Sequence, residues 1–297
     1  MLTVSTARAR VPAPRAAEKS CRDTRRSRAG ARRYRILRAE SKMSRPKTPT
    51  ILRFDSLPST NTEAARQAAL GAPEWLCVVA REQTAGRGRR ERAWASPKDA
   101  GLYLSVVLRP ALGPRDWPLV TLAAALAARD ALAEASGLEA DIKWPNDLLA
   151  GGRKLCGILA ETAEGARGRA VVLGVGVNLR EGSFPAELRD AATSVEGQTG
   201  RAPDAELLLA ALLRALARRY ETLHAPGGAA LTLRDWEAQS SYARGRRVRV
   251  RLAAETFEGN TRGLAPDGAL RVETDDGQLR TVTAGDVTAL RQATGPR

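Results

Sequence analysis

Apolar residues begin to recur with regular spacing near Ile51, and from there short apolar runs alternate with amphipathic segments. Strand side chains repeat every two residues and helix side chains about every 3.6, so this alternation is typical of a mixed α/β (α+β) domain. The pattern predicts helices over residues 60–71, 116–136, 203–223 and 229–238, and strands over residues 76–81, 102–108 and 170–179.

Boundary residues support two of these helices. The run from Thr60 to Glu63 is typical of a capping box, in which a hydroxyl and a later carboxylate satisfy backbone N–H groups of the first turn. Gly71 and Gly137 then end their helices, because glycine readily adopts the left-handed backbone that closes a helix.

Two strand-like runs flank Gly151-Gly152, which predicts a hairpin over residues 147–160. Strict alternation would place Lys154, Cys156 and Ile158 on one face of the second strand. We therefore expect a cation beside apolar groups just past the turn, with Cys156 as a small apolar filler and not a reactive thiol.

After Arg244 the pattern changes to short strands about ten residues apart, with turns at Asp267-Gly268 and Asp276-Gly277. This spacing predicts a small separate β-barrel with strands over residues 247–252, 256–261, 269–273 and 279–283. We expect a basic extension over residues 1–48, a main α/β domain over residues 49–240 and a C-terminal domain over residues 241–292.

Charge is distributed unevenly along the chain. The 297 residues carry a formal net charge of +15, and residues 1–48 hold fifteen Lys or Arg against three acidic residues. The rest is nearly neutral and, at 43% hydrophobic overall, has enough apolar residues for a core. The extension lacks apolar periodicity and is expected to be disordered. It is either a nucleic-acid-binding arm or a segment upstream of a start at Met43.

Cysteine and histidine usage excludes several classes of protein. The three cysteines are widely spaced and odd in number, so a disulfide framework is excluded and a cytoplasmic location is expected. The single histidine, His224, excludes histidine-rich metal sites and is expected at the surface. No apolar run approaches the ~18 residues of a membrane helix. Residues 1–40 lack the apolar segment of a secretory signal, while a transit peptide stays open.

An Arg-rich loop between the first two predicted strands is the first candidate for chemistry. Residues 83–94 place Gly86 and Gly88 among four arginines. Glycine lets backbone approach a ligand closely, and arginine forks pair with phosphate or carboxylate. The alternative is a solvated run of charge. A P-loop is excluded, because no Gly-Lys-Ser/Thr follows.

Two further motifs are ambiguous when each is taken alone. Residues 143–147 read Lys-Trp-Pro-Asn-Asp and supply a cation, an amide and a carboxylate, but they are also typical of a turn. Residues 174–178 read Gly-Val-Gly-Val-Asn and lack the third glycine of a dinucleotide-binding fingerprint.

Together these motifs resemble the biotin–protein ligases. The shared residues are Ser59-Thr60-Asn61, Gly-Arg-Gly-Arg-Arg-x-Arg-x-Trp at 86–94, Lys-Trp-Pro-Asn-Asp at 143–147, Lys-Leu-x-Gly-Ile-Leu at 154–159 and Gly-x-Gly-x-Asn at 174–178. They follow in the family's order over residues 51–290. The resemblance implies a class II aminoacyl-tRNA-synthetase-like catalytic domain, with a mixed sheet flanked by helices, and a small C-terminal SH3-like β-barrel.

The resemblance also implies a two-step reaction. Biotin and MgATP would give biotinyl-5′-AMP and pyrophosphate, and a lysine of a biotin carboxyl carrier domain, such as that of acetyl-CoA carboxylase, would then attack the adenylate. Both attacking groups belong to substrates, so the protein positions reactants and stabilises charge. Biotin, ATP, Mg²⁺ and the carrier are the implied partners. No DNA and no membrane are expected, and a homodimer stays open.

Site residues follow from the resemblance, position by position. Lys154, Arg87 and Asp147 would be catalytic, and Asp147 would hold Mg²⁺ or accept the proton of the incoming lysine. The biotin contacts would be Ser59, Thr60, Asn61, Gln83, Arg87, Gly88, Arg89, Lys154 and Gly157. The ATP or adenylate contacts would be Arg87, Arg89, Arg90, Trp94, Lys143, Asn146 and Asn178, with Trp94 stacking on adenine.

Two differences from relatives change what is expected. Glu91 stands where relatives often have a small residue, so the loop would hold the adenylate less tightly. Only about fifty residues precede Ile51, and they lack a recognition-helix pattern, so a ligase that does not repress transcription is expected. The open alternatives are a lipoate- or octanoyl-transferring enzyme, a nucleic-acid-binding protein, and a biotin sensor without catalysis.

Overall fold

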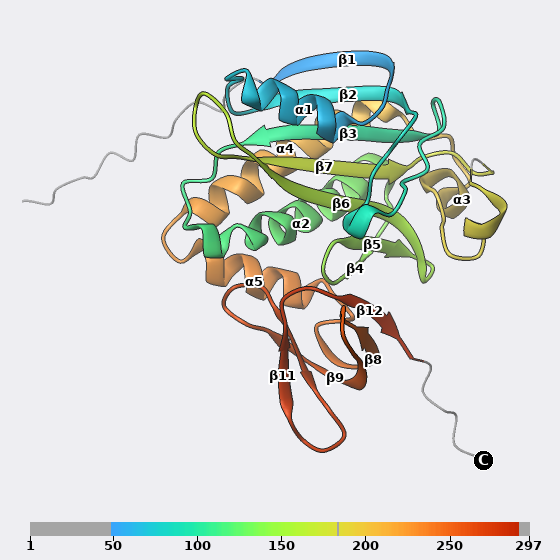
Figure 1. Ribbon diagram of the computed structural model, residues 1–297. Coiled ribbons are helices and arrows are strands. Elements are labelled where there is room, and N and C mark those ends of the chain that lie inside the picture. The colour runs from blue at the N-terminus through green and yellow to red at the C-terminus, as the bar shows by residue number, and fades with distance from the viewer. Residues whose placement is uncertain (1–48, 183, 291–297) are drawn as a thin grey trace, which may run out of the picture. The chain divides into compact units, whose positions relative to one another are not determined.

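The computed structural model describes residues 49–182 and 184–290, and the prediction for residues 1–48 lies outside this part (Figure 1). A seven-stranded sheet in the order β1-β2-β3-β7-β6-β5-β4 forms its larger part, with β1 and β2 parallel and the other pairs antiparallel. The strands are β1 Thr50–Leu57, β2 Leu76–Gln83, β3 Gly101–Leu108, β4 Asp141–Lys143, β5 Asp147–Ala150, β6 Arg153–Ala163 and β7 Ala170–Asn178.

Helices cover both faces of this sheet. One face packs against α1 through a small apolar cluster, and the other packs against α2 and α4 through the main core (Figure 1). The α-helices are α1 Thr60–Ala69, α2 Pro118–Ser136, α3 Val195–Thr199, α4 Ala205–His224 and α5 Gly228–Ala238; the 3₁₀ turns are η1 Arg89–Glu91, η2 Pro114–Asp116 and η3 Ala186–Leu188.

A second, five-stranded antiparallel sheet has the order β11-β10-β9-β8-β12. Its inward residues, including Val248, Val250 and Val287, belong to the same core cluster as α2, so the two sheets share one apolar interior. The indole of Trp144 donates to the carbonyl of Gly268 at 3.0 Å and adds a polar link between the sheets. The strands are β8 Arg244–Arg251, β9 Thr256–Leu264, β10 Leu270–Glu273, β11 Leu279–Val282 and β12 Asp286–Ala289.

Most elements lie where the apolar pattern predicts them, but β1, β12 and α3 are among those that were not predicted. The strand β12 is four residues long and alternates weakly, and the helix α3 has one turn and a single buried residue, so neither produces a periodic pattern. None of the described helices is long and apolar enough to cross a bilayer.

The predicted face of β6 is wrong because the strand bulges. Leu148 pairs with Cys156 and Leu149 pairs with Lys154, which leaves Leu155 as an extra residue. Leu155 and Cys156 are both buried in the main core. Lys154 therefore lies on the opposite face, beside Gly157. Burial raises the pKa of the Cys156 thiol to about 12, as expected of an apolar filler.

The predicted capping box is also wrong. The N-cap of α1 is Ser59, whose side chain makes no capping hydrogen bond. Glu63 instead accepts hydrogen bonds from Arg66 and Gln67 along the helix. The exit from the helix follows the prediction, because Gly71 has a φ of 85°.

His224 is less exposed than predicted. Its Nδ1 lies 2.7 Å from the carbonyl of Tyr220, and its Nε2 accepts from the backbone N–H of Ala111 at 3.2 Å. The ring therefore links the end of α4 to the segment after β3.

Candidate active site

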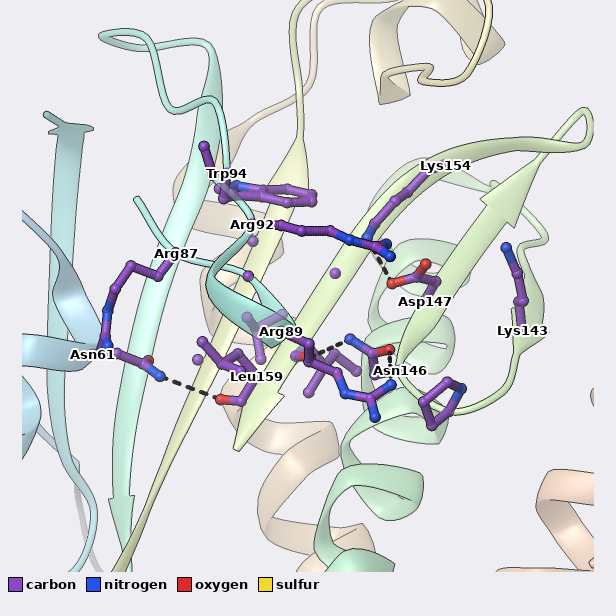
Figure 2. Close-up of a pocket in the computed structure, with 18 of the residues that line it drawn as sticks. Asn61, Arg87, Arg89, Arg92, Trp94, Lys143, Asn146, Asp147, Lys154 and Leu159 are labelled. Carbon is purple, nitrogen blue, oxygen red and sulfur yellow. Dashed lines mark hydrogen bonds and ion pairs between the residues drawn. The ribbon is translucent and has the colours of Figure 1, made fainter. Parts of the chain in front are cut away.

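A pocket of about 380 Å³ lies on the α1 face of the seven-stranded sheet, within the range of small-molecule sites. Its floor comes from β3, β6 and β7, one wall comes from the start of α1, and the Arg-rich loop crosses its mouth. Figure 2 shows two loop arginines, Arg89 and Arg92, on the side of the pocket where Lys143, Asp147 and Lys154 lie, whereas Arg87 lies beside Asn61.

The floor contains paired glycines that make room for larger side chains. Gly157 of β6 pairs with Gly176 of β7, and the indole of Trp94 rests on both. A Cβ on Gly176 would lie 2.7 Å from Trp94 Nε1, and a Cβ on Gly174 would lie 2.3 Å from Asn61 Oδ1. The Gly-x-Gly sequence therefore serves close packing above a sheet.

One end of the pocket is a neutral hydrogen-bonded network. Gln83 Oε1 accepts from the backbone N–H of Thr60 at 2.8 Å and from its hydroxyl at 3.0 Å. Gln83 Nε2 donates to Ser96 Oγ at 2.8 Å, and Ser105 Oγ lies 2.8 Å from Thr60 Oγ1. Because Ser59, Thr60 and Asn61 are each 4% exposed, this end is rigid and shielded from water.

Glu161 joins this neutral end to the Arg-rich loop. Its Oε2 accepts from Asn61 Nδ2 at 2.7 Å and from Arg87 Nη2 at 2.9 Å. One carboxylate thus orients two of the predicted ligand contacts.

The other end of the pocket is charged. Lys154 Nζ lies 2.7 Å from Asp147 Oδ1 and 5.2 Å from the centre of the Trp94 ring (Figure 2). The backbone of Lys154 is held on both sides, since its N–H donates to Ala191 O at 2.8 Å and its carbonyl accepts from Thr193 N at 2.9 Å.

The Arg-rich loop forms a small hairpin. Trp94 N donates to Gly86 O at 2.9 Å and Gly88 N donates to Arg92 O at 2.7 Å. The tip residues Arg90 and Glu91 have φ values of 54° and 59°, in the left-handed region that favours glycine. This backbone gives a physical reason why a small residue suits the position of Glu91.

Three arginines of the hairpin are held by two partners from other parts of the chain. Arg89 Nη1 donates to Asn146 Oδ1 at 3.3 Å, whereas Arg90 and Arg92 both pair with Asp286 of β12. Burial lowers the pKa of the Arg89 guanidinium, and repulsion from Arg90 lowers it further. Asn146 Nδ2 in turn donates to Ile158 O at 2.7 Å, so the amide fixes Arg89 to β6.

Lys143 is a half-buried cation near this cluster. Burial lowers the pKa of its ammonium group, and the charges of Lys154 and Arg92 add to the lowering, while Asp147 and Asp286 oppose it. No hydrogen bond or ion pair of its ammonium is found among the residues that the structure describes.

Thirteen of the predicted site residues line the pocket, and two do not. Arg90 does not line the pocket, although it pairs with Asp286, which does. Asn178, predicted near the nucleotide, donates instead to Lys154 O at 3.3 Å and to Thr193 O at 3.0 Å, so its visible role is to fix the Lys154 backbone. The lining members are Ser59, Thr60, Asn61, Gln83, Arg87, Gly88, Arg89, Trp94, Lys143, Asn146, Asp147, Lys154 and Gly157.

Several other contributors to the site were not predicted. Ser105 lies on a predicted strand, and Glu161 lies one residue beyond the predicted hairpin, where β6 continues to Ala163. Alternation along these two strands could have identified both residues. No local sequence pattern predicts the pocket residues of the second sheet, because only tertiary packing brings that sheet to the pocket. They are Arg249, Arg251, Asp286, Val287 and Thr288.

Asp147 supplies one carboxylate in the pocket that is suited to a metal ion. Asp147 Oδ1 is buried and accepts no hydrogen bond of regular geometry from the described residues, although Lys154 lies close. Within residues 49–182 and 184–290 no group of three or more His, Cys, Asp or Glu is placed to hold a metal. A single carboxylate fits Mg²⁺, which proteins often hold by one or two carboxylates together with substrate phosphates.

Known proteins are similar to this chain in sequence and in fold. Residues 53–178 match the biotin/lipoate A/B protein ligase family, and residues 244–288 match the biotin protein ligase C-terminal domain. The fold is similar to that of the Aquifex aeolicus biotin protein ligase in complex with biotin and ATP, with a TM-score of 0.72, 24% identity, and 82% of this chain and 100% of that chain covered.

Named relatives are more similar in sequence. The bifunctional ligase/repressor BirA of Bacillus subtilis is 38% identical over 80% of this chain and 73% of its own length. The biotin–acetyl-CoA-carboxylase ligase of Mycobacterium tuberculosis is 39% identical over 78% of this chain and 86% of its own length. The chain therefore belongs to the biotin protein ligase family and is a ligase enzyme.

Proposed function

We propose that this protein activates biotin with ATP as biotinyl-5′-AMP and transfers it to a lysine of a biotin carboxyl carrier domain, such as that of acetyl-CoA carboxylase. The observation that carries the proposal is one pocket with a neutral hydrogen-bonding end and a cationic end. On the strand β7, Gly174 lies under Asn61 at the first end, and Asn178, which lies outside the lining, fixes the backbone of Lys154 at the second. At about 3.3 Å per residue these positions lie roughly 13 Å apart, which suits a bicyclic urea followed by an aliphatic acid.

The neutral end would bind the ureido ring. Ser59, Thr60, Asn61 and Gln83 offer buried donors and acceptors that are already oriented by their own hydrogen bonds. Gly88 would let the chain of biotin approach the backbone closely, and Gly157 makes room for Trp94 and Lys154 beside it. Preorganised polar groups lose little conformational entropy when a matching ligand enters.

The cationic end would carry out adenylation. A carboxylate oxygen of biotin forms a bond to the α-phosphorus of ATP, and the bond from that phosphorus to pyrophosphate breaks. Arg87 and Lys154 stabilise the negative charge that builds on the carboxylate and α-phosphate oxygens. Arg89 and Arg90 close over the mixed anhydride and keep water from it. Trp94 stacks on adenine, and Lys143 and Asn146 serve the polyphosphate, while Asn178 fixes the backbone of Lys154.

Asp147 has two proposed roles. Its buried carboxylate would hold Mg²⁺, which supplies charge neutralisation to the phosphates when it is bound. In the second step a lysine nitrogen of the carrier attacks the carbonyl carbon, AMP leaves, and the amine loses a proton. Asp147 is the candidate to accept this proton, since a free lysine with a pKa of about 10.4 is mostly charged at neutral pH.

Finer features of the architecture belong to the same proposal. We propose a class II aminoacyl-tRNA-synthetase-like catalytic domain over residues 49–240 and an SH3-like β-barrel over residues 241–292, preceded by a basic extension. A cytoplasmic location and the absence of DNA binding stay predictions, and homodimerisation is open. Salt-dependent DNA binding that disappears on deletion of residues 1–42 would contradict the prediction for DNA.

The decisive experiment uses labelled biotin, MgATP and a biotin carrier domain. We expect ATP-dependent covalent labelling of the carrier by the wild type and a loss of labelling in Lys154→Ala. Transfer of lipoate or octanoate in preference to biotin would favour the related acyltransferases. Biotin binding without release of pyrophosphate would identify a sensor and contradict ligase activity.

A further inference from the structure

The second sheet supplies a wall of the pocket through two adjacent strands. In the register of β8 and β12, Asp286 pairs with Arg251 and Thr288 pairs with Arg249. Val250 lies between the two arginines and is fully buried. Because side chains alternate along a strand, the two arginines share the opposite face, and both line the pocket.

The pocket as a whole is built for a highly charged anion. Its lining contains seven cationic side chains and two carboxylates. A single carboxylate of biotin cannot balance this excess, whereas the triphosphate of ATP carries several negative charges. The lining cations are Arg87, Arg89, Arg92, Lys143, Lys154, Arg249 and Arg251.

Most of these cations already have partners. Arg87 pairs with Glu161, Lys154 with Asp147, and Arg92 with Asp286. Arg249 pairs with Glu258 at 2.7 Å, and Arg89 donates to Asn146. Within the described part of the chain, no hydrogen bond or ion pair is found for Arg251 or for Lys143.

Among the described residues, Asp286 is paired with other arginines and not with Arg251 or Lys143. Its Cα pairs directly with that of Arg251, yet its carboxylate is occupied by Arg90 and Arg92. The same carboxylate contributes to the electrostatic environment of Lys143. Arg251 and Lys143 thus come from two different sheets and line the same pocket as Asp286.

We propose that Arg251 binds the β- and γ-phosphates of ATP and the departing pyrophosphate, across the pocket from the groups that hold biotin. The proposal rests on the ligase function proposed above and assigns the second sheet a role in it. A guanidinium fork matches two phosphate oxygens at once, which a lysine cannot do in the same geometry. The unpaired state of Arg251 keeps this fork available for the ligand.

The experiment compares Arg251→Ala, Arg251→Lys and Arg271→Ala in the full chain. Arg271 lies on β10 of the same sheet and is absent from the pocket lining. Its substitution therefore removes one positive charge from the sheet without removing the proposed contact. Biotin-dependent pyrophosphate release gives the KM for ATP and for biotin, and added pyrophosphate gives its inhibition constant. Calorimetric titration with inorganic pyrophosphate measures the contact without turnover.

For Arg251→Ala we expect the KM for ATP and the inhibition constant of pyrophosphate to rise together by about 10-fold. This factor is the loss of affinity expected when one charge-assisted hydrogen bond near solvent is removed. The KM for biotin and the transfer from added biotinyl-5′-AMP to the carrier should change less than about 2-fold, and Arg251→Lys should restore part of the loss. Equal thermal unfolding of all variants excludes misfolding.

Two results would overturn the proposal while leaving the ligase function intact. One is an Arg251→Ala variant that matches Arg271→Ala in every constant. The other is a variant impaired only in transfer from preformed adenylate, which would assign Arg251 to the carrier. A wild type that forms no pyrophosphate and does not bind it would overturn both this proposal and the proposed function.

Discussion

The two ends of the pocket are built in different ways. The neutral end consists of short uncharged side chains from α1, β2 and β3, joined by hydrogen bonds of 2.6–3.0 Å between Thr60, Gln83 and Ser105 or Asn61. The charged end consists of long side chains from a hairpin loop and two sheets, joined by ion pairs such as those of Asp286.

This difference indicates how each end responds to a ligand. A buried network of short side chains has few alternative rotamers, so it is already in its binding geometry. Half-exposed ion pairs contribute little to stability and exchange partners readily when phosphate arrives. The neutral end therefore provides specificity for an uncharged ring, and the charged end adjusts to the reaction.

The largest effect is expected at the charged end, from Lys154→Ala. This substitution removes the ammonium group beside Asp147 and should lower the rate of adenylation by about 100- to 1,000-fold, the range for loss of one preorganised charge-stabilising group. Single-turnover formation of biotinyl-5′-AMP measures it. Lys98→Ala is the matched control, because Lys98 pairs with Asp55 and does not line the pocket. Equal rates in the two variants would contradict the assignment.

At the neutral end, Gly174→Ala should weaken biotin binding. The added Cβ would lie 2.3 Å from Asn61 Oδ1 and would displace that amide from the network. Overpacking costs about 1–3 kcal/mol, which corresponds to a loss of roughly 5- to 150-fold in affinity. Titration calorimetry with biotin tests this. Gly113→Ala, whose Cβ would meet nothing closer than 3.7 Å, should bind normally, and unchanged affinity in Gly174→Ala would show that the network tolerates displacement.

A smaller effect is expected from pH through Lys143. Its pKa is lowered mainly by burial, so its charge is lost at a lower pH than that of a free lysine as the pH rises. The KM for ATP should then increase by about 5-fold on the alkaline side, because the phosphates lose a cationic partner. Lys143→Arg should flatten this profile, since arginine stays charged. An identical rise in both proteins would assign the pH dependence to another group.

The smallest effect is expected from Asp286→Asn. Loss of the partially exposed ion pairs should free Arg90 and Arg92 and speed tryptic cleavage within residues 87–92 by about 2- to 5-fold when no ligand is present. Biotin with MgATP should suppress the difference. Asp275→Asn, which removes the partner of Arg247 elsewhere in the second sheet, is the control. Cleavage at the wild-type rate would mean that other contacts hold the loop.

Local sequence predicted much of the fold because most elements are long and amphipathic. The helix α2 and the strand β3 are clear in the apolar pattern, as their 19 and 8 residues give several periods each. The bulge at Leu155 was not predictable, because the pairing with β5 that creates it is a contact between strands. The same error placed Lys154 on the wrong face, although the resemblance to the biotin–protein ligases had already implied a catalytic role for it.

The sequence by itself determined the polar and glycine residues of the site and the family to which the chain belongs, since residue order and type carry that information. Only the tertiary structure decided the partners of these residues. Glu161 accepts hydrogen bonds from Asn61 and Arg87, and Asp286 pairs with Arg92. Arg251 lines the pocket only because sheets and loops that are far apart in the chain pack together. Such contacts depend on packing between elements, which no local pattern encodes.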